Sequence, residues 1–296
     1  MDALPTVRVA GSVTFPGYPP HGLRRCHHAG RGMPPWPSRT RGVDVSIVPA
    51  GTPCWTDLAT PDLDDARRFY PELFGWTGRI APEPEAGGYT LFLRHGRAVA
   101  GAGPPAIPEQ VPIWSVYIAT DDADLVAGRV EQAGGQLVVP PFDVFDRGRM
   151  AVFSDPAGAT VSVWQPMTMP GGEVFGVPGA MSWTELVTPD PEGAKTFYEL
   201  VFGWQPDDQP TGSAGHTGWR LGSRIVAGMT APLGDFPADS PAYWSVYFGV
   251  ADVDAAAARA AALGGAILVP PRDVPAGRCT ALRDPQGALF HVITPP

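Results

Sequence analysis

CWTDLATPD, residues 54–62, returns as SWTELVTPD at residues 182–190. Both copies continue into Phe-Tyr, at Phe69-Tyr70 and Phe197-Tyr198, and then into Phe-Gly-Trp. The two repeated tryptophans lie 128 residues apart (183 − 55), and later motifs keep nearly the same spacing. Because solenoid repeats are only about 20–50 residues long, a repeat of this length indicates a duplicated domain.

The duplication divides the chain of 296 residues into four parts. We predict a first domain over residues 51–167, a linker over 168–178 and a second domain over 179–296, with domains of about the usual size. Residues 1–50 have no counterpart in the second half and are rich in Pro, Gly, Arg and His. This segment shows neither helix nor strand periodicity, so we predict a disordered tail.

Composition excludes several classes of function. A net charge of −9 argues against nucleic acid as a partner. No apolar run approaches the roughly 18 residues of a membrane span, so no membrane is expected as a partner. Three scattered cysteines are too few for a disulfide framework or a zinc site, and they favour a reducing, cytoplasmic location.

Each domain repeats one order of elements. In the first domain we expect a strand at Trp55–Thr60 and a helix that begins after the N-cap Asp62 and ends at Gly75. A second helix is predicted at Ala123–Gln132. Further strands are predicted at Tyr89–Arg94, Arg97–Gly101, Ile113–Ala119, Gln136–Val144, Arg149–Ser154 and Thr160–Gln165. The chain therefore reads as an α+β protein of four βαβββ modules, with helices on one face of mixed sheets whose other face curls into a cup.

The motifs of this chain resemble the vicinal oxygen chelate superfamily of glyoxalases, bleomycin- and fosfomycin-resistance proteins and extradiol dioxygenases. The resemblance rests on Thr-Pro-Asp, Phe-Tyr and Phe-Gly-Trp, on a Gly-Gly turn, and on an Asp-Pro-x-Gly hairpin, and it covers residues 52–296. The tandem form is similar to two-domain glyoxalase/bleomycin-resistance proteins of actinobacteria. It implies two tandem glyoxalase-like domains, each with one cup-shaped sheet, but it leaves the reaction open because superfolds host many functions.

Metal ligands in that superfamily are His, Gln or Glu side chains on the first and last strands of the modules. The corresponding positions here hold Trp55, Ser115, Ser162, Trp183, Ser245 and His291, and the remaining strand offers only residues 99–101 and 227–229, which are small or apolar. Catalytic zinc takes about three protein ligands, and the iron facial triad takes two His and a carboxylate. We therefore expect no metal site and no cofactor.

Aromatic side chains fill the cups instead. Strand alternation places residues i and i+2 on one face. The first cup is then lined by Trp55, Asp57, Ser115, Tyr117, Ser162 and Trp164, and the second by Trp183, Glu185, Ser245, Tyr247, His291 and Ile293. Apolar walls with a few convergent polar groups are typical of small-ligand sites, and Trp and Tyr faces suit a flat guest.

Two functions remain open. The first is a binding protein that takes up a small hydrophobic or aromatic molecule without metal, as the bleomycin-resistance branch of the resemblance implies. The second is an enzyme, either a glyoxalase-like lyase or isomerase or a hydroxylase- or dioxygenase-type protein. It would use Glu185, Tyr247 and His291 for proton transfer, since a carboxylate among aromatic walls has a raised pKa, or it would use a metal site with other ligands.

A few features carry further expectations. Arg149 and Arg278 occupy matching places and either close a cup over an anionic ligand or lie solvated at the surface. His95 and His216 are expected near turns and exposed. One cup could bind while the other is structural. The duplicated domains allow either a pseudo-dimeric monomer or a homodimer.

Overall fold

The computed structural model describes residues 48–106, 110–208, 216–232 and 241–294. The tail predicted over residues 1–50 lies outside the described residues except for residues 48–50, of which Val48 is buried. In the described part of the chain, no helix is long and apolar enough to cross a membrane.

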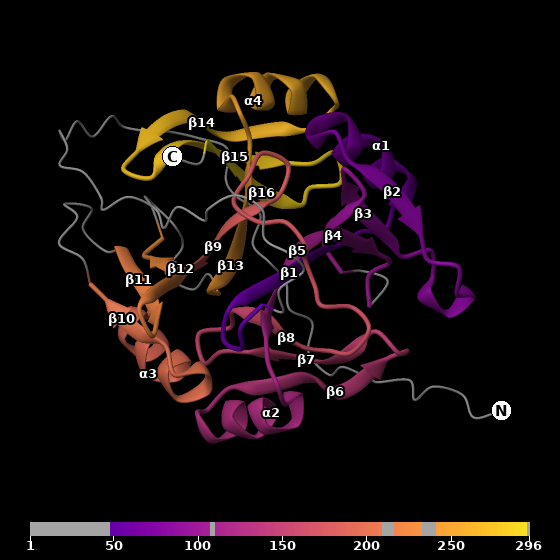
Figure 1. Cartoon of the computed structure of the whole chain (residues 1–296). Coiled ribbons are helices and arrows are strands. Elements are labelled where there is room, and N and C mark those ends of the chain that lie inside the picture. Colours follow the sequence, from indigo (N-terminus) through magenta and orange to yellow (C-terminus); the bar gives the residue numbers. More distant parts are fainter. Residues whose placement is uncertain (1–47, 107–109, 209–215, 233–240, 295–296) are drawn as a thin grey trace.

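Both halves contain the same α-helices and β-strands in the same order (Figure 1). The first half consists of β1 (Pro53–Ala59), α1 (Leu63–Phe74), β2 (Thr77–Ile80), the 3₁₀ turn η1 (Pro84–Ala86), β3 (Thr90–Arg94), β4 (Arg97–Gly103), β5 (Ile113–Ala119), α2 (Ala123–Gln132), β6 (Gln136–Val144), β7 (Gly148–Ser154) and β8 (Thr160–Pro166). The second half consists of β9 (Met181–Val187), α3 (Pro191–Phe202), β10 (Gln205–Asp207), β11 (His216–Leu221), β12 (Arg224–Thr230), β13 (Tyr243–Gly249), α4 (Val253–Ala262), β14 (Ala266–Val274), β15 (Gly277–Arg283) and β16 (Leu289–Ile293). These are the four predicted βαβββ modules.

Local sequence sets the ends of the first helix of each half. The Asp62 carboxylate accepts a hydrogen bond from the Asp65 amide at 2.9 Å, as an N-cap does. Gly75 ends α1 with φ 71°, a left-handed conformation that favours glycine. Strand β2 was not placed from the sequence, because all four of its residues are exposed and give no alternation of apolar and polar side chains.

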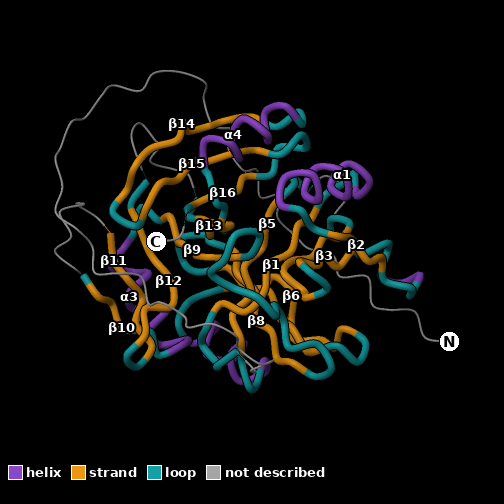
Figure 2. Tube along the Cα trace, turned by 45° about the horizontal axis from the view of Figure 1, so that its top comes forward, coloured by secondary structure: helices purple, strands orange, loops and turns teal. Residues whose placement is uncertain are grey.

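Each half forms one eight-stranded mixed sheet, in the orders β2-β3-β4-β1-β5-β8-β7-β6 and β10-β11-β12-β9-β13-β16-β15-β14. In the first sheet, β1 pairs with β4 in parallel and with β5 in antiparallel orientation, and β5 pairs with β8 in parallel. The second sheet repeats this pattern. The edge strands do not pair with each other, so each sheet is an open cup with helices on its convex side (Figure 2).

The helices of one half lie beside the helices of the other half. Helix α1 lies beside α4, and α2 lies beside α3 (Figure 1). The repeated tyrosines of α1 and α3 form hydrogen bonds to the other half. The Tyr70 hydroxyl donates to Asp284 Oδ2 of the second half at 2.8 Å and accepts from Trp114 Nε1 of its own half at 2.9 Å. Tyr198 does the same with Asp155 and Trp244. The repeated Phe-Tyr and Asp-Pro-x-Gly motifs therefore hold the two halves together.

Candidate functional site

Strand register places the predicted lining residues of the first half on one concave face. Trp55 lies opposite Tyr117, which pairs with Ser162 on β8. Asp57 lies opposite Ser115, and Ala119 pairs with Trp164. Paired residues on neighbouring strands point to the same side of a sheet, so the structure brings together the six side chains that alternation predicts.

Asp57 is held by two tyrosines. The Tyr117 hydroxyl lies 3.2 and 3.1 Å from the two carboxylate oxygens, and the Tyr89 hydroxyl lies 3.4 Å from Oδ2. Trp55 Nε1 donates to the Tyr89 hydroxyl at 3.2 Å. Burial raises the pKa of Asp57 to about 6, although the two tyrosine hydrogen bonds act in the opposite direction.

The segment that leads to the second half covers the aromatic part of the first cup. Met169 and Phe175 pack against the cluster that contains Trp55 and Trp164. Trp164 Nε1 donates to the Met169 carbonyl at 2.9 Å. Trp55 and Trp164 are only 3% and 6% exposed, so this part of the first cup is filled by the chain itself.

The second half repeats the layout with more accessible side chains. Trp183 lies opposite Tyr247, which pairs with His291, and Glu185 lies opposite Ser245. Trp183, Tyr247 and His291 are half-buried, whereas their counterparts in the first half are buried. Among the described residues only Thr294 follows β16, so no described segment matches the one that covers Trp55 and Trp164.

Glu185 has a histidine partner that sequence reasoning missed. His216 Nε2 lies 3.1 Å from Glu185 Oε1, and the Tyr247 hydroxyl donates to Oε2 at 2.8 Å. The expectation that His216 is exposed was wrong, because it opens β11 and turns onto the concave face. Aligning the two halves matches His216-Thr217 with Tyr89-Thr90, and this match could have indicated that His216 contacts Glu185 as Tyr89 contacts Asp57.

The environment of Glu185 shifts its pKa opposite to that of Asp57. Burial raises the pKa, but the hydrogen bond and charge of His216, the Tyr247 hydrogen bond and nearby His291 outweigh burial and leave it lowered. The two buried acids differ because Glu185 has a histidine partner, whereas the partners of Asp57 are tyrosines. The raised pKa expected for both carboxylates therefore holds for Asp57 and is wrong for Glu185.

His291 is a neutral, incompletely bonded group. Its ring stacks on that of Tyr247 with centroids 4.3 Å apart and an interplanar angle of 19°. Burial lowers the pKa of His291 to about 4, so the imidazole is uncharged near neutral pH. His291 Nδ1 and Ser245 Oγ are both buried without a hydrogen-bond partner. Such atoms are uncommon in folded proteins and mark places where a ligand or water completes the bonding.

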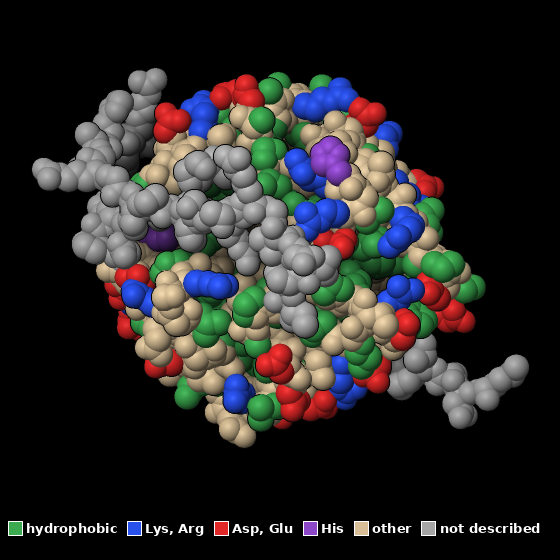
Figure 3. All heavy atoms as spheres, in the orientation of Figure 1, with side chains coloured by type: hydrophobic (Ala, Val, Ile, Leu, Met, Phe, Trp, Pro, Cys, Tyr) green, Lys and Arg blue, Asp and Glu red, His purple; other side chains and the backbone are tan. Residues whose placement is uncertain are grey.

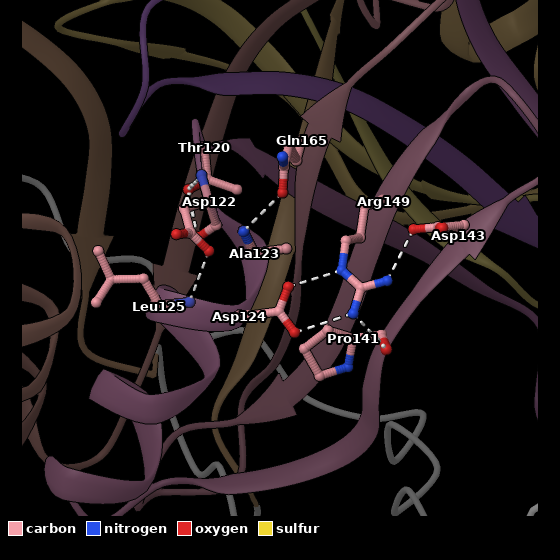
Figure 4. A network of polar contacts seen from close by, with 9 residues as sticks. All are labelled: Thr120, Asp122, Ala123, Asp124, Leu125, Pro141, Asp143, Arg149 and Gln165. Atoms are coloured by element: carbon pink, nitrogen blue, oxygen red, sulfur yellow. Dashed lines mark hydrogen bonds and ion pairs between the residues drawn. The ribbon is translucent and has the colours of Figure 1, made fainter.

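The two hairpin arginines are already paired with carboxylates, and Figure 4 shows the contacts of Arg149. Arg149 donates to Asp124 at 2.7 and 2.9 Å and to Asp143 at 2.7 Å. Arg278 forms the same contacts with Asp254 and Asp273. These pairs tie each hairpin to a helix start and argue against closure over an anionic ligand. On the face shown in Figure 3, acidic and basic side chains are interspersed.

The Glyoxalase/Bleomycin resistance protein/Dioxygenase superfamily matches residues 53–163 and again residues 180–292. The chain belongs to this superfamily. The two matched ranges fall on the two cup-shaped sheets, so each half is one domain of the superfamily fold.

Curated relatives cover most of the chain. It is 45% identical over 259 residues to an anthracycline biosynthesis protein, DnrV, of Streptomyces peucetius, with 82% of this chain and 93% of the relative aligned. It is 41% identical over 251 residues to a putative glyoxylase, CFP32, of Mycobacterium tuberculosis, with 83% and 95% aligned.

Solved structures show the same fold at low identity. A Mn(II)-bound glyoxalase from Novosphingobium aromaticivorans has a TM-score of 0.59 and 17% identity, with 83% of this chain and 82% of that chain aligned. The 2,3-dioxygenase LapB from Pseudomonas has a TM-score of 0.60 and 12% identity, with 84% and 93% aligned.

The residues of this chain do not fit a metal ion such as the Mn(II) bound by the Novosphingobium glyoxalase. A Cβ atom added at Gly101 would lie 1.9 Å from the Tyr89 hydroxyl, and one at Gly228 would lie 3.0 Å from both Glu185 Oε1 and Trp183 Nε1. Tyr89, Glu185 and Trp183 thus fill the space that a metal-ligating side chain on β4 or β12 would enter. Within residues 48–106, 110–208, 216–232 and 241–294, no group of three or more His, Cys, Asp and Glu could hold a metal ion.

Proposed function

We propose that this protein binds a planar aromatic small molecule on the concave face of its second half, without a metal ion. The aromatic surface is supplied by Trp183 and Tyr247, which are half-buried and therefore accessible in part. Aromatic rings stack on flat ligands and bury large apolar areas. A few convergent polar groups then orient the ligand.

The observation that carries the proposal is the pair of unpartnered polar atoms on this face. Ser245 Oγ and His291 Nδ1 lack partners although Glu185 and Tyr247, beside them, are bonded to each other. A buried polar atom without a partner costs about 1–3 kcal/mol, which a ligand oxygen or hydroxyl would recover. In the first half, Ser162 replaces the histidine and residues 169–175 cover the aromatic rings.

The relatives support a polycyclic aromatic ligand. One relative is named an anthracycline biosynthesis protein, and anthracyclines contain a flat fused-ring system. The absence of a fitting donor set supports metal-independent binding, since Trp183, Ser245 and His291 supply one nitrogen ligand among three aligned positions.

An enzymatic function is the alternative, and the Glu185 contacts favour it. A carboxylate that orients a histidine is a recurring arrangement in acid–base catalysis. Here Glu185 holds His216 through Nε2 and Tyr247 through its hydroxyl. Neutral His291 can accept a proton from a bound substrate. Retained ligand affinity with lost turnover in Glu185→Gln would establish this alternative.

Binding is tested with 9,10-anthraquinone-2-carboxamide, a flat uncharged probe, by thermal unfolding and by quenching of tryptophan fluorescence. A ligand at 100 times its Kd stabilises the folded state by about 2.7 kcal/mol. We expect Trp183→Ala and Ser245→Ala to weaken binding, and the matched first-half variant Ser115→Ala to leave it unchanged. No stabilisation by the probe, or equal loss with Ser115→Ala, would contradict the proposed site.

A further inference from the structure

Arg272 lies on the concave face of the second half, near His291. It pairs with Cys279 on β15, and Cys279 pairs with Ile293 on β16. Ile293 stands two residues after His291, so alternation puts all four side chains on the same side of the sheet. Burial is the main cause of the lowered pKa of His291, and the charge of Arg272 lowers it further, as expected for a nearby cation.

Arg272 contacts the Cys279 thiol through a side-chain hydrogen bond, but a thiol does not neutralise its charge. In the part of the chain that the structure describes, no carboxylate forms an ion pair with Arg272, and its side chain is exposed. Arg278, on the same hairpin, is held by Asp254 and Asp273. The two arginines therefore differ. Arg278 fastens the hairpin to α4, whereas Arg272 presents a guanidinium beside the aromatic surface that no carboxylate of the described residues neutralises.

The first half has no cation at this position. Val139-Pro140-Pro141-Phe142-Asp143 matches Val269-Pro270-Pro271-Arg272-Asp273, so Phe142 stands where the second half has Arg272. Phe142 pairs with Met150, and Met150 pairs with Trp164, which makes this row apolar in the first half. The duplicated halves thus differ in a charge at the edge of the same concave face.

We propose that Arg272 selects ligands of the second half by binding an anionic oxygen, a carboxylate or an ionised phenol, carried by the aromatic ligand. This inference rests on the proposed function. A guanidinium donates paired N–H groups in a geometry that matches a carboxylate. His291 Nδ1 and Ser245 Oγ provide sites for neighbouring ligand oxygens. The Glu185 carboxylate does not compete for Arg272, because both of its oxygens are bonded to His216 and Tyr247.

The test compares 9,10-anthraquinone-2-carboxylate with the uncharged 2-carboxamide on four proteins: the natural chain, R272Q, R272F and R278Q. Affinity is measured by calorimetry at constant ionic strength. A hydrogen-bonded ion pair of this kind corresponds to an affinity difference of about tenfold or more. We expect the natural protein and R278Q to prefer the carboxylate, and R272Q and R272F to lose that preference while keeping their affinity for the carboxamide. R278Q removes the same charge and controls for the net charge of the protein.

Three results would overturn the inference. The first is an unchanged carboxylate preference in R272Q. The second is an equal loss of affinity for both probes in R272Q and R272F, which would make Arg272 a structural residue. The third is a natural protein that binds the carboxamide but shows no preference for the carboxylate, which would leave the proposed function intact. If neither probe binds the natural protein, the proposed function fails and this inference fails with it.

Discussion

Neutralising the two equivalent carboxylates, Asp57 and Glu185, should change stability in opposite directions. The pKa of Asp57 rises from 3.8 to about 6 on folding, because burial dominates over its tyrosine hydrogen bonds. The favourable contribution of this shift is fully present below pH 3.8 and is lost as pH rises through about 6. At about 1.36 kcal/mol per pKa unit, ionised Asp57 costs up to roughly 3 kcal/mol at pH 7. Asp57→Asn should therefore stabilise the protein there, by about 1–3 kcal/mol.

Glu185→Gln should do the reverse. The folded pKa of Glu185 is lowered, so its contribution is present above the unfolded value and is lost as pH falls through the folded value. Neutralisation at pH 7 removes the carboxylate that His216 contacts and that accepts the Tyr247 hydrogen bond, a loss of about 1–3 kcal/mol.

Urea unfolding between pH 4 and pH 8 measures both effects, with the slope of free energy against denaturant checked for each variant. Asp57→Asn should also flatten the pH dependence between 3.8 and about 6. His216→Tyr supplies the matched control, since it gives Glu185 the partner type that Asp57 has. In that background Glu185→Gln should lose most of its destabilising effect. Destabilisation of similar size by Asp57→Asn and Glu185→Gln at pH 7 would refute the reasoning.

Three further perturbations follow from the same contacts. The lowered pKa of His291 contributes stability that is present above pH 6.5 and is lost as pH falls toward about 4. His291→Ser should therefore make the melting temperature fall less over this pH range than it does in the natural protein. The same pH dependence of the melting temperature in both proteins would contradict this expectation. Tyr70→Phe removes the donor to Asp284 and should lower the free energy of unfolding in urea by about 1–3 kcal/mol, whereas an unchanged midpoint would show that the bond contributes nothing. Gly101→Ala forces Tyr89 to move and should cost about 1–3 kcal/mol by the same assay; a neutral effect would mean that Tyr89 moves freely.

Much of the fold could be predicted because the repeated motifs have local causes. Asp62 caps a helix and Gly75 ends one through their own backbone chemistry, and alternation placed Trp55, Asp57 and Tyr117 on one face. Strand β2 escaped prediction because an exposed strand carries no hydrophobic pattern. Pairing between modules, such as α1 with α4, depends on contacts between distant segments that periodicity does not encode.

The sequence predicts which residues line the candidate site, but it does not predict the pKa shifts and charge pairs of these residues. The lining residues followed from strand alternation, which is a local property. His216 was missed because its role depends on where β11 lies relative to β9, two strands that are separated by β12. The accessibility of the two cups could not be predicted either, since residues 169–175 cover Trp55 and Trp164 through tertiary packing. The pairing of Arg278 with carboxylates, and the lack of a described carboxylate partner for Arg272, likewise depend on neighbours from other elements.

The most direct test of the central claim is calorimetric titration of the protein with 9,10-anthraquinone-2-carboxylate after exhaustive dialysis against a metal chelator, with metal content measured on the same sample. We expect saturable binding at one site per chain in protein that holds no stoichiometric metal, and loss of that binding in Trp183→Ala. Binding that disappears with the chelator and returns with Mn²⁺, Zn²⁺ or Fe²⁺, or a metal ion retained at one per chain through dialysis, would contradict it.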